Sequence, residues 1–370
     1  MATVKPKVLV LGGCGFIGRH IVCELVRKGV SVNVCVVDKV PPQIAWLNDE
    51  QTKVFNDDAV TFKSANLINA ASCSAAFGEE EWDWVINAAG ETKTGQAEAV
   101  YHEGIVRLST NCAKEAAKRR VKVYLEVSAG NMASDDKVPH KESDSCSPWT
   151  VNAKCKHQVE EELKNIPDLN WIIVRPAIVY GISDRTGLTP RLVYGAVYRH
   201  LKETMKMLWD KNLHINTVNV TDVARAVVWL CQREKVHQIY NLVDDGNTLQ
   251  GDVTELVSDI FNINHDYWGN KLSHLAKVRT DIMGLVNEVN EKHLVPWAAV
   301  CSAGGLDNTP ITPYIDQDAV LHCHLHLDGS KLRSEGFTYA MPKPTQELLT
   351  EVLKDFVTMK IFPASALPSQ

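Results

Sequence analysis

The stretch Val8-Leu-Val-Leu-Gly-Gly-Cys-Gly-Phe-Ile-Gly18 decides how the chain is expected to fold. Its four apolar residues predict a buried strand, its spaced glycines a tight turn, and the apolar residues from Ile17 onward the face of a helix. The glycines let the backbone turn sharply and approach a ligand closely, while the helix start offers free N–H groups and the positive end of its dipole. This order of strand, turn and helix predicts a pyrophosphate-binding site.

An acidic residue follows at the spacing that a bound dinucleotide requires. Asp38 ends the second apolar run, residues 32–37, and lies twenty positions after Gly18. A carboxylate there accepts hydrogen bonds from the ribose hydroxyls of adenosine and repels a 2′-phosphate. We therefore expect NAD as the cofactor, with NADP less favoured, although the neighbouring Lys39 weakens this preference slightly. The alternative is that the glycines only form a tight turn and that Asp38 is a solvated strand-end residue.

Short β-branched runs alternate with segments of helical period along the first half of the chain. The predicted strands are residues 8–11, 32–37, 60–63, 84–87, 123–127 and 171–174. This alternation predicts a Rossmann-type doubly wound α/β domain with a parallel sheet.

Beyond Pro176 the alternation becomes irregular, which indicates a smaller C-terminal substrate lobe. The helices expected there are residues 220–229 and 272–289, and the expected strand is 238–242. We expect the NAD-binding domain at residues 1–181 with a returning segment near 215–245, a mainly substrate-binding lobe at 182–361, and a loose tail at 362–370.

The composition is that of an ordinary globular protein. The chain has 370 residues, of which 45% are hydrophobic and 23% charged, and a formal net charge of -6. This charge does not attract nucleic acid or anionic membranes, and no apolar run is long enough to cross a bilayer. We expect a cytoplasmic protein with no nucleic-acid or membrane partner. The ten cysteines, which form no Cys-x-x-Cys pair, are expected to be reduced and mostly packed in the core.

Several segments, in this order and spacing, resemble the extended short-chain dehydrogenase/reductases, the NAD-dependent epimerase/dehydratase group. Besides the glycine-rich opening, the segments are Trp-Val-Ile-Asn-Ala-Ala-Gly at 84–90, Val-Ser-Ala at 127–129, Arg-Pro-Ala-Ile-Val-Tyr-Gly at 175–181, and parts of 218–224, 239–242 and 328–337. The resemblance therefore covers almost the whole chain. It implies a small-molecule substrate with a reactive hydroxyl, either a nucleotide sugar or another bulky secondary alcohol. It also implies a homodimer formed through paired helices.

The resemblance further implies which residues contact the cofactor. They are Gly12, Gly13, Gly15, Phe16, Ile17 and Gly18 at the diphosphate, Asp38 and Lys39 at the ribose, Asn66 and Leu67 at the adenine, and Ala88, Ala89, Gly90 and Pro176 near the nicotinamide.

In that family a tyrosine acts as acid/base on the substrate hydroxyl, and a lysine four residues later makes the phenol a useful base. A serine completes the site, and Ser128 stands at the expected strand end. The expected helix at 149–163 carries both Lys154 and Lys156. The position of Glu160, four residues after Lys156, favours Lys156 as the catalytic lysine.

The tyrosine of this pattern is missing. Counting four residues back gives Asn152 from Lys156 and Thr150 from Lys154, and neither side chain titrates in the useful range. Three explanations of the missing tyrosine stay open. Another side chain takes its place, a water molecule relays the proton, or the reaction needs no such base. The stand-ins that we considered are Cys155, His157, Tyr124 and Tyr180, and spacing supports none of them.

Two functions stay open at this point. The first is an NAD-dependent oxidoreductase, epimerase or dehydratase, and the second is a catalytically degenerate protein that keeps NAD as a structural or sensing ligand. His322, His324 and His326 alternate along one stretch, but three ligands on a straight strand span too far for a tetrahedral centre, so we predict no metal site. Arg191 and Arg279 have the chemistry to clamp a phosphate, although solvated arginines are the commoner case.

Overall fold

The computed structural model describes residues 5–269, 282–315, 321 and 323–368. Its centre is a seven-stranded sheet in which every neighbouring pair is parallel. In spatial order the strands are β3 (Val60–Ser64), β2 (Asn33–Asp38), β1 (Lys7–Leu11), β4 (Trp84–Asn87), β5 (Val123–Val127), β6 (Trp171–Pro176) and β10 (Gln238–Leu242). The strand order reverses between β1 and β4, which is where doubly wound sheets bind their ligands. The predicted Rossmann-type fold is thereby confirmed.

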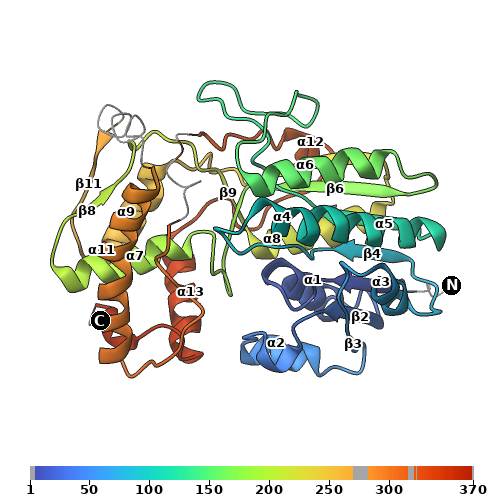
Figure 1. Cartoon of the computed structure of the whole chain (residues 1–370), viewed down its shortest axis with the longest axis horizontal. Helices are drawn as coiled ribbons and strands as arrows, with labels where there is room; N and C mark the ends of the chain where they lie inside the picture. Colours follow the sequence, from blue (N-terminus) through green and yellow to red (C-terminus); the bar gives the residue numbers. More distant parts are fainter. Residues whose placement is uncertain (1–4, 270–281, 316–320, 322, 369–370) are drawn as a thin grey trace.

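Helices cover both faces of this sheet (Figure 1). On one face lie α1 (Phe16–Arg27) and α8 (Val220–Arg233), with α2 (Asp49–Phe55) against α1. On the other face lie α3 (Ala70–Phe77), α5 (Leu108–Lys118) and α6 (Val151–Lys164). Because both faces are covered, the central strand β1 is an apolar run in which Val8 and Val10 enter one core and Leu9 and Leu11 the other.

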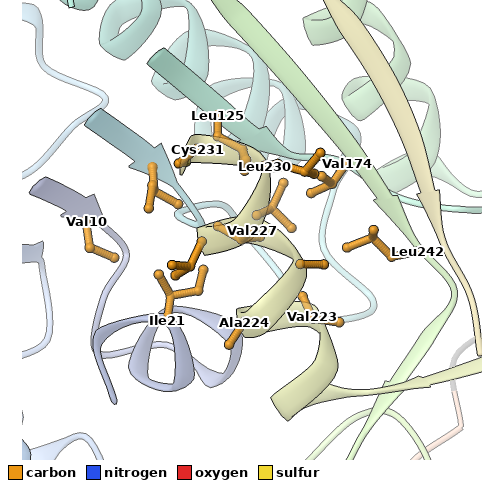
Figure 2. Close-up of a cluster of buried hydrophobic side chains, with 14 of the residues drawn as sticks. Val10, Ile21, Leu125, Val174, Val223, Ala224, Val227, Leu230, Cys231 and Leu242 are labelled. Carbon is orange, nitrogen blue, oxygen red and sulfur yellow. The ribbon is translucent and has the colours of Figure 1, made fainter. Parts of the chain in front are cut away.

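The core between the sheet and helices α1 and α8 shows why these segments fold together. Val10 on β1, Ile21 on α1 and Val227 on α8 are fully buried, and Figure 2 shows them in one cluster with Leu242 of β10. The structure thus has the helix expected at 220–229, extended to Arg233, and the strand expected at 238–242. β10 is the edge strand of the central sheet and α8 packs on that sheet, although both follow part of the second lobe in sequence.

The second lobe is built around a separate apolar core formed by four helices. They are α7 (Thr189–Leu201), α9 (Gln250–Phe261), α11 (Ile282–Ala303) and α13 (Gln346–Thr358). Two small parallel pairs flank them, β8 (Met205–Met207) with β11 (His265–Tyr267) and β7 (Ile178–Tyr180) with β9 (Thr217–Asn219). The remaining short elements are η1 (Pro42–Ile44), α4 (Glu98–Tyr101), the π-helical turn η2 (His102–Arg107), α12 (Ser330–Ser334) and η4 (Ala364–Ala366).

The structure bears on three expectations from the sequence, namely a long helix in the second lobe, a loose C-terminal tail and buried cysteines. The first part of the helix expected at 272–289, up to residue 281, lies outside the described residues, and α11 occupies the rest and runs on to Ala303. The loose tail expected from 362 does not fit the first residues of that segment, because Phe362 is buried against Trp297 and Ala366 is also buried. Eight of the ten cysteines are buried, as expected for packing residues. Among the described helices, none combines the length and apolarity needed to cross a membrane.

Candidate cofactor and catalytic site

The glycine turn between β1 and α1 is closed to side chains. A Cβ on Gly18 would lie 2.2 Å from the Gly12 carbonyl oxygen, and a Cβ on Gly12, whose φ is +73°, would lie 2.5 Å from the Ala89 nitrogen. Both distances are far below any real contact of a Cβ atom. The turn therefore packs tightly against the end of β4 and requires glycine at these two positions.

The start of α1 is open to an anion. Its N-cap residue is Gly15, which has no side chain to cap the helix. The N–H groups of the first turn therefore have no intrahelical partner, and the helix dipole adds partial positive charge at the same place. This cradle fits a diphosphate group, so the residues present agree with a dinucleotide cofactor.

Asp38 connects the end of β2 to this turn. Its Oδ2 accepts a hydrogen bond from the Cys14 N–H at 3.1 Å, and its Oδ1 accepts one from the Val40 N–H at 3.0 Å. Each carboxylate oxygen can accept more than one bond, and the side chain is only half-buried, so acceptor capacity remains for ribose hydroxyls. The neighbouring Lys39 is exposed.

The other proposed cofactor residues lie at the carboxyl ends of three strands of the same parallel sheet, β3, β4 and β6. Asn66 is exposed and Leu67 buried just after β3, whereas Ala88, Ala89 and Gly90 are half-buried just after β4, and Pro176 ends β6. The sheet thus brings them to the same edge as the glycine turn.

Sequence reasoning missed Arg19, whose hydrogen bonds join the glycine turn to the segment after η1. This fully buried side chain on α1 donates to the carbonyl oxygens of Cys14 and Gly15 in the turn, and to those of Ala45 and Trp46 after η1. Burial, followed by the charge of Arg185, lowers its pKa to about 10. Nothing in the local pattern of α1 indicates that a cation faces inward here.

The structure distinguishes the two candidate lysines on α6. Lys154 is exposed, whereas Lys156 is buried. Thr150, the residue four positions before Lys154, is used as the N-cap, because its Oγ1 accepts a bond from the Ala153 N–H at 3.0 Å. Asn152 and Lys156 are therefore the pair that faces the sheet edge.

Lys156 lies at the part of the sheet edge where β4 and β5 end. Its Nζ donates to the Val127 carbonyl oxygen at 2.7 Å and to Glu126 Oε1 at 3.2 Å, and it lies 3.6 Å from the place where a Cβ on Gly90 would be. Asn152 sits one helical turn away and donates its Nδ2 to the Glu91 carbonyl oxygen at 3.1 Å. An amide side chain thus stands four residues before the buried lysine.

Ser128 is joined to a buried ion pair. Its Oγ donates to Glu160 Oε1 at 2.5 Å, and the two oxygens of Glu160 also accept bonds from Arg175, the shortest being 2.6 Å. All three side chains are buried. The Ser128 hydroxyl proton is therefore directed at Glu160, which leaves its oxygen as an acceptor toward a ligand.

Three of the four stand-in groups are buried in a way that disfavours their ionised form. Burial raises the pKa of Cys155, and it raises the pKa values of Tyr124 and Tyr180 above the usual range for a phenol. The fourth, His157, is a half-buried residue of α6. A raised pKa makes a thiol or phenol a poorer base precursor near neutral pH, so none of these three replaces the tyrosine.

The remaining sequence candidates are two arginines and the alternating histidines. His322 and Arg279 lie outside the described residues, while Arg191 is a half-buried residue of α7. His326 stacks on His214 with ring centroids 3.8 Å apart. In the described part of the chain, no three His, Cys, Asp or Glu side chains are grouped to hold a metal ion.

Comparison with known proteins agrees with this geometry. The chain is 25% identical over 243 residues to a decarboxylating sterol-4-alpha-carboxylate 3-dehydrogenase of Candida albicans, covering 63% of this chain and 66% of that protein. It is 28% identical over 183 residues to a UDP-glucose 4-epimerase of Neisseria meningitidis serogroup C, covering 45% of this chain and 51% of that protein. These alignments span less than two thirds of the length of either relative.

A solved structure shares the fold over nearly the full length. The UDP-glucose 4-epimerase of Thermus thermophilus, determined in complex with NAD, superposes with a TM-score of 0.67 at 18% identity, covering 95% of this chain and 99% of that one. The family model described as "NAD dependent epimerase/dehydratase family" matches residues 8–242. The expected cofactor, NAD, is thus confirmed as that of the family. Because the matched residues make up more than half of its length, the chain belongs to the NAD-dependent epimerase/dehydratase family.

Proposed function

We propose that the protein is an NAD-dependent oxidoreductase of the epimerase/dehydratase type, acting on a hydroxyl of a nucleotide sugar or of another bulky secondary alcohol. The observation that carries this proposal is the position of Lys156, whose Nζ lies at Gly90 on the same sheet edge as the glycine turn and Asp38. The relatives named as a UDP-glucose epimerase and a sterol dehydrogenase support this substrate class.

The chain's own residues divide the work between binding and orientation. The turn at Gly12–Gly18 and the start of α1 hold the diphosphate, and Asp38 accepts bonds from the adenosine ribose. Lys156 donates to the ribose next to the nicotinamide, and Ser128 offers its oxygen as an acceptor to the substrate hydroxyl. Bound NAD supplies the oxidation and reduction of the substrate carbon.

The proton of the substrate hydroxyl needs an acceptor other than residue 152, because an amide does not take up a proton near neutral pH. We propose that water at the sheet edge accepts it. The reaction is then slower than one assisted by a phenolate, since positioned general bases contribute about 10²–10⁴-fold to such steps.

A second candidate function is a catalytically degenerate NAD-binding protein that acts as a scaffold or sensor. Two specific observations favour it. Asn152 replaces a titratable group, and the charge of Lys156 is paired with Glu126. In this case NAD binding stabilises the fold without turnover.

One experiment separates the two candidates. Purified protein is titrated with NAD by calorimetry and then incubated with a panel of UDP-sugars and hydroxysteroids. Nicotinamide absorbance detects net oxidation, and chromatography detects epimers that form without net reduction. The oxidoreductase proposal expects turnover by the parent and by Lys154→Met, whose lysine is exposed, and loss of turnover in Lys156→Met under conditions where circular dichroism shows that this variant is folded. NAD binding without any turnover supports the second candidate, and failure to bind NAD overturns both.

A cytoplasmic, homodimeric state is part of the proposal. The burial of eight of the ten cysteines, which are thiols and not disulfides in the structure, supports a reducing compartment. Light scattering coupled to size-exclusion chromatography tests the dimer, which a monomeric mass would exclude.

A further inference from the structure

A charged residue lies in the middle of a buried parallel strand, next to the proposed site. Glu126 of β5 is fully buried, and its carboxylate accepts four hydrogen bonds. Oε2 accepts from Asn87 Nδ2 at 2.7 Å and from the Tyr124 hydroxyl at 2.8 Å. Oε1 accepts from Ser109 Oγ at 3.0 Å and from Lys156 Nζ at 3.2 Å. Every acceptor direction of the carboxylate thus faces a donor.

The neighbouring phenol does not share the negative charge. Burial, followed by the charge of Glu126, raises the pKa of Tyr124 well above its usual range, so Tyr124 stays a neutral donor. The only cation among the four partners is Lys156. Glu126 and Lys156 therefore form the ion pair of this cluster.

The ion pair limits both the hydrogen bonds that Lys156 can donate to a ligand and the effect of its positive charge at the site. Two of its three N–H groups donate to Glu126 and to the Val127 carbonyl oxygen, which leaves one for a ligand. A hydroxyl near Asn152, one helical turn away, meets a cation whose charge is offset by a carboxylate 3.2 Å behind it. A nearby cation lowers the pKa of a hydroxyl, and a compensating anion removes much of that effect.

We propose that Glu126 is a positioning residue, which directs Lys156 toward the cofactor and offsets its charge, so that the site binds NAD without ionising a hydroxyl beside residue 152. This inference rests on the proposed NAD site. It predicts that a tyrosine placed at position 152 alone is not activated, and that it becomes activated when the carboxylate at position 126 is also removed.

The test measures the pKa of the introduced phenol. Asn152→Tyr, and the double variant Asn152→Tyr with Glu126→Gln, are labelled with ¹³C at the tyrosine Cζ and titrated by NMR without cofactor. The signal that the parent lacks identifies the new residue. We expect a pKa near the ordinary value of about 10 in the single variant, and a value lower by at least about one unit in the double variant. Equal values, or a single variant that is already lowered by this amount, would overturn the inference.

A second substitution at position 126 shows whether the result depends on the new side chain or on misfolding. Glutamine at position 126 introduces an N–H that competes with the donors around it, so Glu126→Met, which adds no donor, is examined in parallel. Circular dichroism and thermal melting confirm that each variant is folded. A purely structural role for Glu126 would change the melting temperature of both variants but leave the phenol pKa where it is in Asn152→Tyr.

The same proteins separate this inference from the proposed function. NAD titration of the parent tests the cofactor site alone, and its failure would sink the proposed function while the phenol titration still stands. Conversely, normal NAD binding by the parent combined with equal phenol pKa values refutes only the role given to Glu126.

Discussion

The buried pair of Glu160 and Arg175 gives the sharpest stability prediction. Glu160 accepts three contacts from Arg175, at 2.6, 3.0 and 3.2 Å, and one from Ser128. Burial lowers the pKa of Arg175, but the bonds and charge of Glu160 outweigh it and the net shift is upward. Glu160→Ala leaves this guanidinium buried, with the Cys146 sulfur as its remaining hydrogen-bond partner among the described residues. Loss of one partner of a buried pair costs about 3–5 kcal/mol, which we expect here.

The next residue on the same helix provides a matched control. Glu161 forms an ion pair with Lys164, but both side chains are largely exposed, so Glu161→Ala is expected to cost less than about 1 kcal/mol. Urea unfolding followed by circular dichroism and by tryptophan fluorescence measures both, and coincident transitions justify comparing the free energies. If the two variants differ by less than about 1 kcal/mol, the reasoning from burial is wrong. Replacing both partners, as Glu160→Leu with Arg175→Met, is expected to recover most of the loss.

Three further predictions concern the cofactor turn and the response to pH. Gly18→Ala places a Cβ 2.2 Å from a carbonyl oxygen, so NAD affinity measured by calorimetry should fall at least about tenfold; unchanged affinity would contradict the tight turn. Asp38→Asn removes the charge that repels a 2′-phosphate, so the ratio of NADP to NAD affinity should rise, and a constant ratio would count against the role of Asp38. Burial raises the pKa of Asp244 to about 7, so the folded state binds a proton more tightly than the unfolded state. The free energy of unfolding should therefore fall by up to about 4 kcal/mol between pH 4 and pH 7 relative to Asp244→Asn, and parallel pH profiles of the two proteins would refute this.

The parts of the fold that were predictable are those fixed by local pattern. A strand buried on both faces is rich in apolar residues, so the seven strands of the sheet could be found to within two residues at each end. The cofactor turn could be found because its glycines, its helix start and Asp38 lie within one short segment. The helix after Val220 has a clear apolar face, and it is present in the structure.

The polar clusters could not be predicted, because their members come from distant segments. In sequence, Glu126 is one acid inside an apolar run, and its partners Asn87, Ser109 and Lys156 lie on β4, α5 and α6. Arg19 is likewise one cation on α1, and two of its partners, the carbonyl oxygens of Ala45 and Trp46, lie after η1. A pattern within one element does not show which groups on other elements compensate such a buried charge.

These clusters also give structural roles to Lys156 and Ser128. Removing Lys156 would leave the buried carboxylate of Glu126 without its cation, and a buried charge without its counter-charge is strongly destabilising. Ser128 is similarly tied to Glu160. Both residues therefore stabilise the fold in addition to the roles proposed for them at the site. Gly15 is different, because it leaves the start of α1 without a side-chain cap, and the free N–H groups together with the helix dipole favour an anion there.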